Sequence, residues 1–193
     1  MSDAADRMRY GASALATPAN AITVARMALA IPFLGFVANG GASYWAVVAW
    51  FVLAGSDGVD GHLARKHGTT RSGAFLDPLA DKVLVLGASW ALVASGTFWW
   101  VPVLLITVRE IGISVFRSWY ARRGIAVPAR YSAKVKTVVQ ELAVALALLP
   151  PVAENAEWLH VGVLWAAVVL TIGTGISYLT DGARSFSETG DRG

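Results

Sequence analysis

The sequence contains no cysteine and few charged residues. The absence of cysteine excludes a disulfide scaffold and every metal site built on thiolates. Only 15% of the 193 residues are charged and 55% are hydrophobic, whereas a soluble domain averages about 25% charged residues. Many aromatic residues and a net charge of only +3 also exclude a disordered chain. The basic balance fits a nucleic-acid binder or a membrane protein, and the apolar fraction favours the membrane protein, with no nucleic-acid partner.

Six apolar stretches have the length of membrane-spanning helices, which require about 20 mostly apolar residues. We therefore predict an all-α, polytopic membrane protein of six transmembrane helices with a polar cavity that faces the cytoplasm. The helices are predicted at about 20–38, 43–64, 74–95, 98–119, 132–150 and 158–180. Residues 17–182 then form the transmembrane domain. Residues 1–16, which lack the pattern of a signal peptide, form a cytoplasmic segment with a short interfacial helix, and 183–193 form a flexible cytoplasmic tail.

Positive charge divides the ends of these stretches into two sides. None of the 16 Lys and Arg residues lies in one alternate set of connections, namely 38–42, 95–97 and 150–157. The positive-inside rule therefore places both termini and the connections 65–71 and 120–131 in the cytoplasm, in a multi-pass protein of the cell membrane. The outer interface is then marked by four tryptophans, Trp45, Trp99, Trp100 and Trp158.

Four aspartates occur in or beside the second and third apolar stretches. Asp57 and Asp60 are three residues apart and Asp77 and Asp81 are four apart, so each pair projects from one face of its helix. Clustered carboxylates repel unless they are neutralised. Two divalent cations would cancel their charge, and oxygen ligands favour Mg²⁺, Mn²⁺ or Ca²⁺. Such a site can hold a pyrophosphate during a displacement at phosphorus. The alternative is four ordinary aspartates that face water at helix ends; their shared spacing favours the cation site.

Small residues and an arginine surround these aspartates. They complete the pattern D-x-x-D-G-x-x-A-R, a seven-residue spacer, and G-x-x-x-D-x-x-x-D between Asp57 and Asp81. This pattern resembles the signature of the CDP-alcohol phosphatidyltransferases, and all eight of its fixed positions are present. The similarity extends over about residues 17–180, and includes Thr17–Arg26 in the first stretch and Arg109–Arg117 in the fourth.

The resemblance implies a donor, a cofactor and an assembly. The donor is CDP-diacylglycerol, the acceptor is a small alcohol, and the protein is a homodimer in the lipid bilayer. Two divalent cations, Mg²⁺ or Mn²⁺, are held by the four aspartates, and Asp81 also acts as the general base. The CDP site is lined by Gly58, Gly61, Ala64, Arg65 and Gly73.

Basic residues in the first, fourth and fifth stretches indicate a phosphate site for the acceptor. They are Arg26, Arg109, Arg117, Lys134 and Lys136. The alternative is that the residues nearest the helix ends only anchor those ends in the headgroup region. Glu110 and Glu141 lie deeper, and we expect them to pair with buried Arg or Lys.

These residues favour transfer of the phosphatidyl group to sn-glycerol 3-phosphate, which gives phosphatidylglycerophosphate and CMP. Two alternatives keep the donor and change the acceptor to phosphatidylglycerol or to an inositol phosphate. An alternative from another class is a divalent-cation carrier. A carrier typically has paired broken helices in related halves, whereas the aspartate motif occurs once here and the sequence has no internal repeat.

Overall fold

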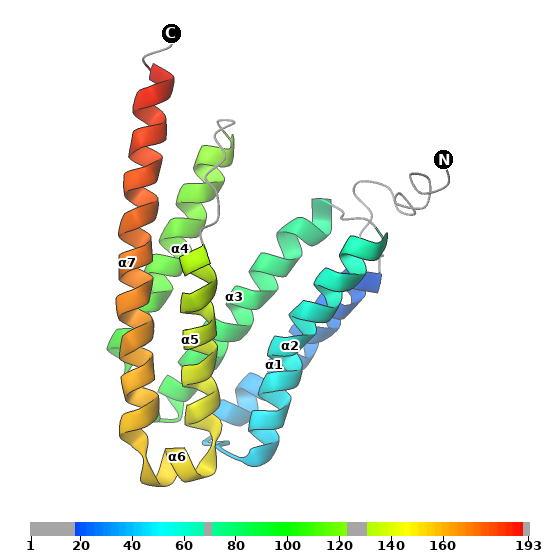
Figure 1. The fold of residues 1–193 in the computed structure, drawn as a ribbon. Helices are drawn as coiled ribbons and strands as arrows, with labels where there is room; N and C mark the ends of the chain where they lie inside the picture. The colour runs from blue at the N-terminus through cyan, green and yellow to red at the C-terminus, as the bar shows by residue number, and fades with distance from the viewer. Residues whose placement is uncertain (1–17, 68–70, 123–130, 191–193) are drawn as a thin grey trace.

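The computed structural model describes the backbone of residues 18–67, 71–122 and 131–190, and the side chains of residues 20–56, 78–116, 118–120 and 134–175. The described backbone forms helices and no strands (Figure 1). The helices are α1 (Pro18–Ala38), α2 (Tyr44–His67), α3 (Arg71–Ala94), α4 (Trp100–Arg122), α5 (Tyr131–Leu148), α6 (Pro150–Asn155) and α7 (Glu157–Gly190). The predicted all-α fold is therefore confirmed.

Six of these helices coincide with the six predicted stretches, and three differences stand out. First, α2 and α3 extend into the spacer of the aspartate motif, so that only residues 68–70 separate them. Second, α7 continues to Gly190, through most of the segment predicted as a tail. Third, the predicted connection 150–157 contains a short helix, α6. Pro150 and Pro151 begin this helix after the extended Leu149, since the first turn of a helix needs no N–H from proline. The predicted segment 1–16 lies outside the described residues.

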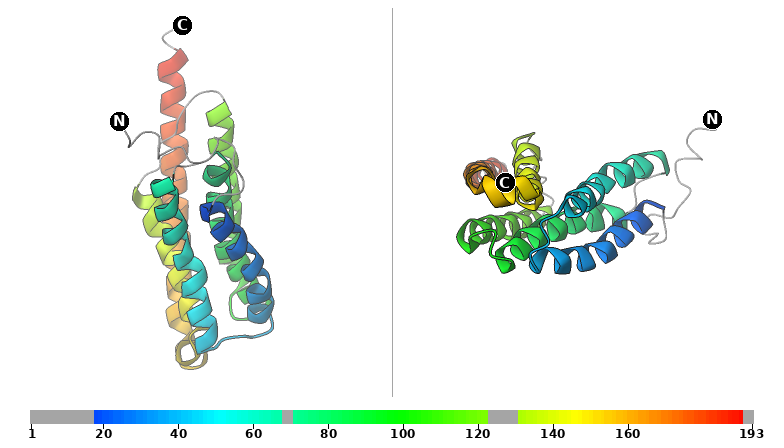
Figure 2. Two further views of the ribbon diagram at one scale, coloured as in Figure 1. Left: turned by 90° about the vertical axis from the view of Figure 1, so that its right-hand side faces the viewer. Right: turned by 90° about the horizontal axis from the view of Figure 1, so that it is seen from below.

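The six long helices run alternately up and down. Helices α1, α2 and α3 pack together, as do α4, α5 and α7, and α3 contacts both α4 and α5 (Figures 1 and 2). The connections 39–43 and 95–99 lie at the same end of the bundle as α6, and the first turn of α1 and the last turn of α7 lie toward the other end (Figure 1). This alternation matches the two sides that the charge pattern predicts.

The core joins the two groups of helices through an indole ring. Trp50 of α2 is 1% exposed and stacks on Phe33 of α1, with ring centroids 6.2 Å apart. Its Nε1 donates a hydrogen bond of 3.2 Å to the backbone oxygen of Glu141 in α5. A buried Trp needs such an acceptor for its N–H, so this one side chain fixes three helices against each other.

The outer surface of the bundle is unusually apolar. Large apolar side chains are exposed along α1, α2, α4 and α7, among them Ile31, Val52, Val115 and Val169. A soluble monomer rarely exposes apolar patches of more than a few hundred Å². Within the described residues, Asn20–Ala38 and Glu157–Gly175 are long and apolar enough to cross a membrane. These features are those of a membrane protein.

Only two of the six predicted spans meet that criterion, because the described side chains of the other four helices form stretches shorter than a membrane span. Helices α3, α4 and α5 contain Asp, Glu, Lys or Arg inside their apolar stretches, and the apolar segment described in α2, Tyr44–Ser56, is shorter. The tryptophans predicted at the outer interface are exposed, Trp45 by 82%. They lie at or beside the first residues of α2, α4 and α7, which begin at the end of the bundle that contains α6 (Figure 1).

Gly87 provides a test of the contact between α1 and α3. A Cβ at this position would lie 2.8 Å from Leu34 Cδ1, so we expect Gly87→Val to overpack the contact and to lower the free energy of unfolding by about 1–3 kcal/mol. Thermal unfolding in detergent measures the change. The matched control is Gly35→Val on α1, where a Cβ meets no atom within 4 Å. Equal effects of the two substitutions would contradict close packing at Gly87.

Candidate active site

Of the four predicted cation ligands, Asp81 has a side chain that the structure describes. It is partly buried on α3 and interacts electrostatically with Lys136 of α5. The remaining predicted site residues lie outside the part of the chain whose side chains the structure describes. They are the cation ligands Asp57, Asp60 and Asp77, the CDP-site residues Gly58, Gly61, Ala64, Arg65 and Gly73, and the acceptor-site residue Arg117. Their backbone belongs to α2, α3 and α4.

The aspartate pairs fit hard divalent cations by their chemistry and their position in the fold. All four offer carboxylate oxygens, the ligand type that Mg²⁺ and Mn²⁺ prefer. One pair lies on α2 and the other on α3, two helices that contact each other and are separated by residues 68–70. Among the side chains described, no three acidic or histidine residues gather in a metal-binding group. The predicted site therefore depends on the three aspartates outside that part.

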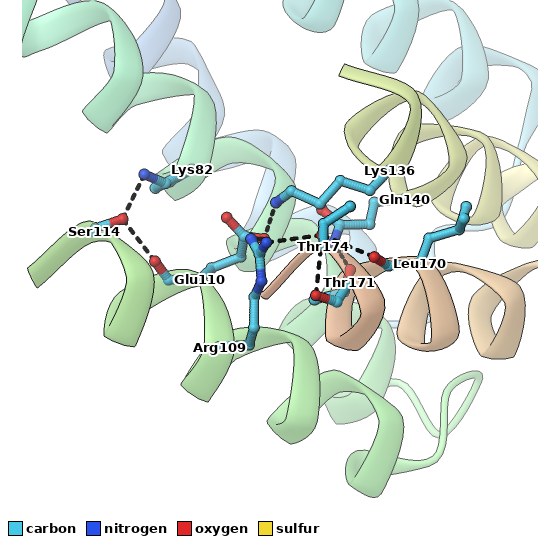
Figure 3. Close-up of polar contacts among 9 residues, drawn as sticks. All are labelled: Lys82, Arg109, Glu110, Ser114, Lys136, Gln140, Leu170, Thr171 and Thr174. Atoms are coloured by element: carbon cyan, nitrogen blue, oxygen red, sulfur yellow. Dashed lines mark hydrogen bonds and ion pairs between the residues drawn. The ribbon is translucent and has the colours of Figure 1, made fainter. Parts of the chain in front are cut away.

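A buried cluster of charged side chains joins α4, α5 and α7 (Figure 3). Arg109 Nη1 donates a hydrogen bond of 2.9 Å to Glu110 Oε1, and the same oxygen accepts a hydrogen bond from Lys136 Nζ. The second terminal nitrogen of Arg109, Nη2, donates to the hydroxyl of Thr174 at 2.8 Å. One carboxylate thus binds two cations, and α7 holds one of these from the other side.

The described side chains of this cluster carry more positive than negative charge. The side chains of Glu110 and Lys136 are 9% and 7% exposed, so water screens them little. A further cation lies nearby on α3, where Lys82 Nζ donates to Ser114 Oγ at 2.6 Å. The positive charges of Lys82 and Lys136 repel each other. Among the described side chains of this region, three cations therefore lie near two carboxylates, Glu110 and Asp81, and such an excess in a poorly hydrated site favours a bound anion.

The predicted acceptor residues have different positions in the fold. Arg109 and Lys136 come together at Glu110, and the expectation that Glu110 pairs with buried cations is confirmed. Lys134 is exposed, although it lies only two residues from Lys136. Arg26 is buried on α1, a helix that packs mainly against α2 and α3. Of the four predicted acceptor residues whose side chains are described, the structure thus joins Arg109 and Lys136 in one cluster.

Sequence reasoning assigned no role to the uncharged members of this region. Ser114 contacts Lys82 and donates to the backbone oxygen of Glu110, while Thr174 contacts Arg109. One turn from Thr174, Thr171 accepts a hydrogen bond of 3.0 Å from Gln140 of α5. The available signal was the spacing of the two threonines, three residues apart and therefore on one face of an apolar helix.

The aspartate pattern and this cluster belong to an enzyme of known class. A family model, CDP-alcohol phosphatidyltransferase, matches residues 16–173, and the chain belongs to this family. It is 40% identical over 184 residues to a probable phosphatidylglycerophosphate synthase of Mycobacterium tuberculosis, which covers 90% of this chain and 85% of that protein. It is also 39% identical to proteins named CDP-diacylglycerol–glycerol-3-phosphate 3-phosphatidyltransferase. With the protein from Rickettsia bellii, the match covers 82% of this chain and 91% of the relative. With the protein from Escherichia coli, it covers 70% of this chain and 76% of the relative.

Glu110 provides a test of the charge balance in the cluster. Glu110→Gln keeps the shape of the side chain but leaves Arg109 and Lys136 buried without their carboxylate, so we expect a loss of about 3–5 kcal/mol in the free energy of unfolding. Adding Lys136→Met should recover part of this loss, because it removes one of the unbalanced cations. Thermal unfolding of Glu110→Gln, of Lys136→Met and of the double variant measures these losses. Glu154→Gln, at an exposed position, is the control. Additive losses in the double variant would contradict the pairing.

Proposed function

We propose that the protein transfers the phosphatidyl group of CDP-diacylglycerol to sn-glycerol 3-phosphate, giving phosphatidylglycerophosphate and CMP. The observation that supports this acceptor most directly is the buried pair of cations, Arg109 and Lys136, within the part of the chain that the family model matches. A phosphomonoester carries close to two negative charges at neutral pH and would therefore offset the net positive charge of Arg109, Lys136 and Glu110. Relatives named for the same reaction support the choice.

The donor site in this proposal consists of the aspartates and their small neighbours. Two divalent cations, Mg²⁺ or Mn²⁺, would be held by Asp57, Asp60, Asp77 and Asp81. Bound there, the cations would supply neutralisation of the donor pyrophosphate. The CDP moiety would be lined by Gly58, Gly61, Ala64, Arg65 and Gly73.

The reaction needs a base for the acceptor hydroxyl. Asp81 accepts that proton while the hydroxyl oxygen forms a bond to the β-phosphorus of the donor. The bond from this phosphorus to the CMP oxygen breaks, and CMP departs with the electron pair. Asp81 suits this role because its helix, α3, contains predicted donor-site residues and packs against α4 and α5, which contain Arg109 and Lys136. Its charge also interacts with that of Lys136. The rest of the catalytic effect would come from positioning the substrates and neutralising their charge, on which phosphoryl transfer mainly depends.

Arg109 and Lys136 bind the acceptor phosphate in this proposal. Arg117, Lys134 and Arg26 are further candidates for that site, by position in the sequence. Glu110 holds Arg109 and Lys136 side by side but supplies only one negative charge, so the pair keeps a positive charge for the substrate.

The proposed arrangement in the membrane has six spanning helices, a cytoplasmic polar cavity and both termini in the cytoplasm. The protein is proposed to be a homodimer. The sorting of all basic residues away from 38–42, 95–97 and 150–157, together with the exposed tryptophans at the ends that these connections join, supports this orientation.

The acceptor can be identified directly. With purified protein, CDP-diacylglycerol and Mg²⁺ or Mn²⁺, we expect CMP release and lipid labelling with labelled sn-glycerol 3-phosphate, because the cation pair matches a phosphomonoester. A chelator should stop the reaction, and added cation should restore it. Labelling only from phosphatidylglycerol or from inositol phosphate would replace the proposed acceptor. No CMP release with any acceptor would favour a cation carrier instead.

The role of Asp81 can be tested separately. Asp81→Asn keeps the size of the side chain and one oxygen ligand but removes the base, so we expect turnover to fall by about 100-fold or more. Turnover should be measured at saturating Mg²⁺ or Mn²⁺, with cation binding checked by the shift in thermal unfolding. Glu154→Gln, an exposed carboxylate on α6, is the control and should retain turnover. Near-normal turnover of Asp81→Asn with cation bound would exclude Asp81 as the base.

A further inference from the structure

Two small residues of α7 contact the guanidinium group that the proposed acceptor site depends on. Thr174 and Gly175 both lie against Arg109 of α4 (Figure 3 shows Thr174). Neither belongs to the aspartate pattern, and the family match ends at residue 173, just before them. They are buried in the part of α7 that packs against α4 and α5.

The Thr174 hydroxyl can only accept from Arg109. An arginine has no acceptor atom, and the hydroxyl hydrogen is directed at the backbone of its own helix, to Leu170 O at 2.8 Å and Thr171 O at 3.1 Å. The oxygen therefore presents a lone pair to Nη2 of Arg109, 2.8 Å away. Because the hydroxyl is neutral, it orients the guanidinium without cancelling its charge. A carboxylate at this position would orient it equally well but would repel a phosphate.

Gly175 leaves the space that the arginine stem occupies. A Cβ at position 175 would lie 3.1 Å from Nε of Arg109, closer than most side chains approach, and 3.4 Å from Cγ, at the limit of ordinary contact. At Gly173, two residues earlier, a Cβ would meet no atom within 4 Å. The side chain of Arg109 is thus held between α4 and α7, with the neutral Thr174 at one terminal nitrogen and Glu110 at the other.

We propose that Thr174 and Gly175 are positioning residues that fix the guanidinium of Arg109 for the phosphate group of the acceptor. The inference rests on the proposed function, because it assigns Arg109 to that phosphate. Neither residue touches the substrate. They act through the direction of the Arg109 N–H groups, which lie in one rigid plane.

The test compares the KM values of the two substrates in four variants of the full chain. Thr174→Val removes the hydroxyl at constant shape, and we expect the KM for sn-glycerol 3-phosphate to rise about tenfold, as for loss of a hydrogen bond to a charged group. Gly175→Ala displaces the stem by a few tenths of an ångström and should raise it about threefold. The KM for CDP-diacylglycerol and kcat should each stay within about twofold, the pattern of lost ground-state binding.

Two further variants serve as rescue and control. Thr174→Ser restores the hydroxyl and should return the acceptor KM toward that of the unaltered chain. Gly173→Ala makes the same change as Gly175→Ala in the same helix, at a position with open space, and should leave both KM values unchanged.

Each outcome separates this inference from the proposed function. Suppose that the unaltered chain transfers the phosphatidyl group to sn-glycerol 3-phosphate, but Thr174→Val and Gly175→Ala leave the acceptor KM unchanged. This result overturns the positioning role alone. Equal increases in both KM values, or a loss of kcat in Thr174→Val that Thr174→Ser does not restore, also overturn it, because they indicate general disruption. If the unaltered chain uses only an acceptor without a phosphomonoester, the positioning role and the proposed function both fail.

Discussion

A carboxylate inside an apolar bundle is stable only where cations neutralise it, and Glu110 meets this requirement by binding two at once. Arg109 reaches the carboxylate from the same helix, whereas Lys136 reaches it from α5. Arg109 also extends to Thr174, so the contacts of this one buried carboxylate relate α4, α5 and α7 to each other. Because the side chains are almost fully buried, any shift of these helices would expose unbalanced charge to apolar surroundings.

Helix α3 couples this charged region to the aspartate pattern. Asp81 and Lys82 are consecutive on α3; the first interacts with the charge of Lys136, and the second donates to Ser114 of α4. The last aspartate of the family signature is therefore adjacent in the chain to a contact with the acceptor-side helices. In the proposed reaction this matters, because the base must reach a hydroxyl of a molecule whose phosphate is bound by other helices.

The sequence allowed the helices to be predicted because long apolar runs are unambiguous, and it allowed the pairing of Glu110 to be predicted because a buried carboxylate requires a cation. It could not separate Lys134 from Lys136. Residues that are two positions apart on a helix differ by about 200° around its axis, and only packing determines which of the two faces inward. Helix α6 was missed because paired prolines more often indicate a loop. Thr174 was missed because a threonine in an apolar helix usually bonds only to its own backbone, as this one also does.

The neutral contact at Thr174 explains how such a site can be both stable and ready for an anion. Full compensation by a second carboxylate would stabilise the empty cluster but would oppose the binding of a phosphate. The observed compromise has one carboxylate for two cations. The uncharged hydroxyls of Thr174 and Ser114 each accept one hydrogen bond, from Arg109 and Lys82 respectively, without adding negative charge. In the proposed acceptor site, the residual positive charge lowers the stability of the cluster, and an anionic ligand would restore the balance. Directional hydrogen bonds from uncharged groups can therefore set the geometry of a charged site while the charge itself remains available to the substrate.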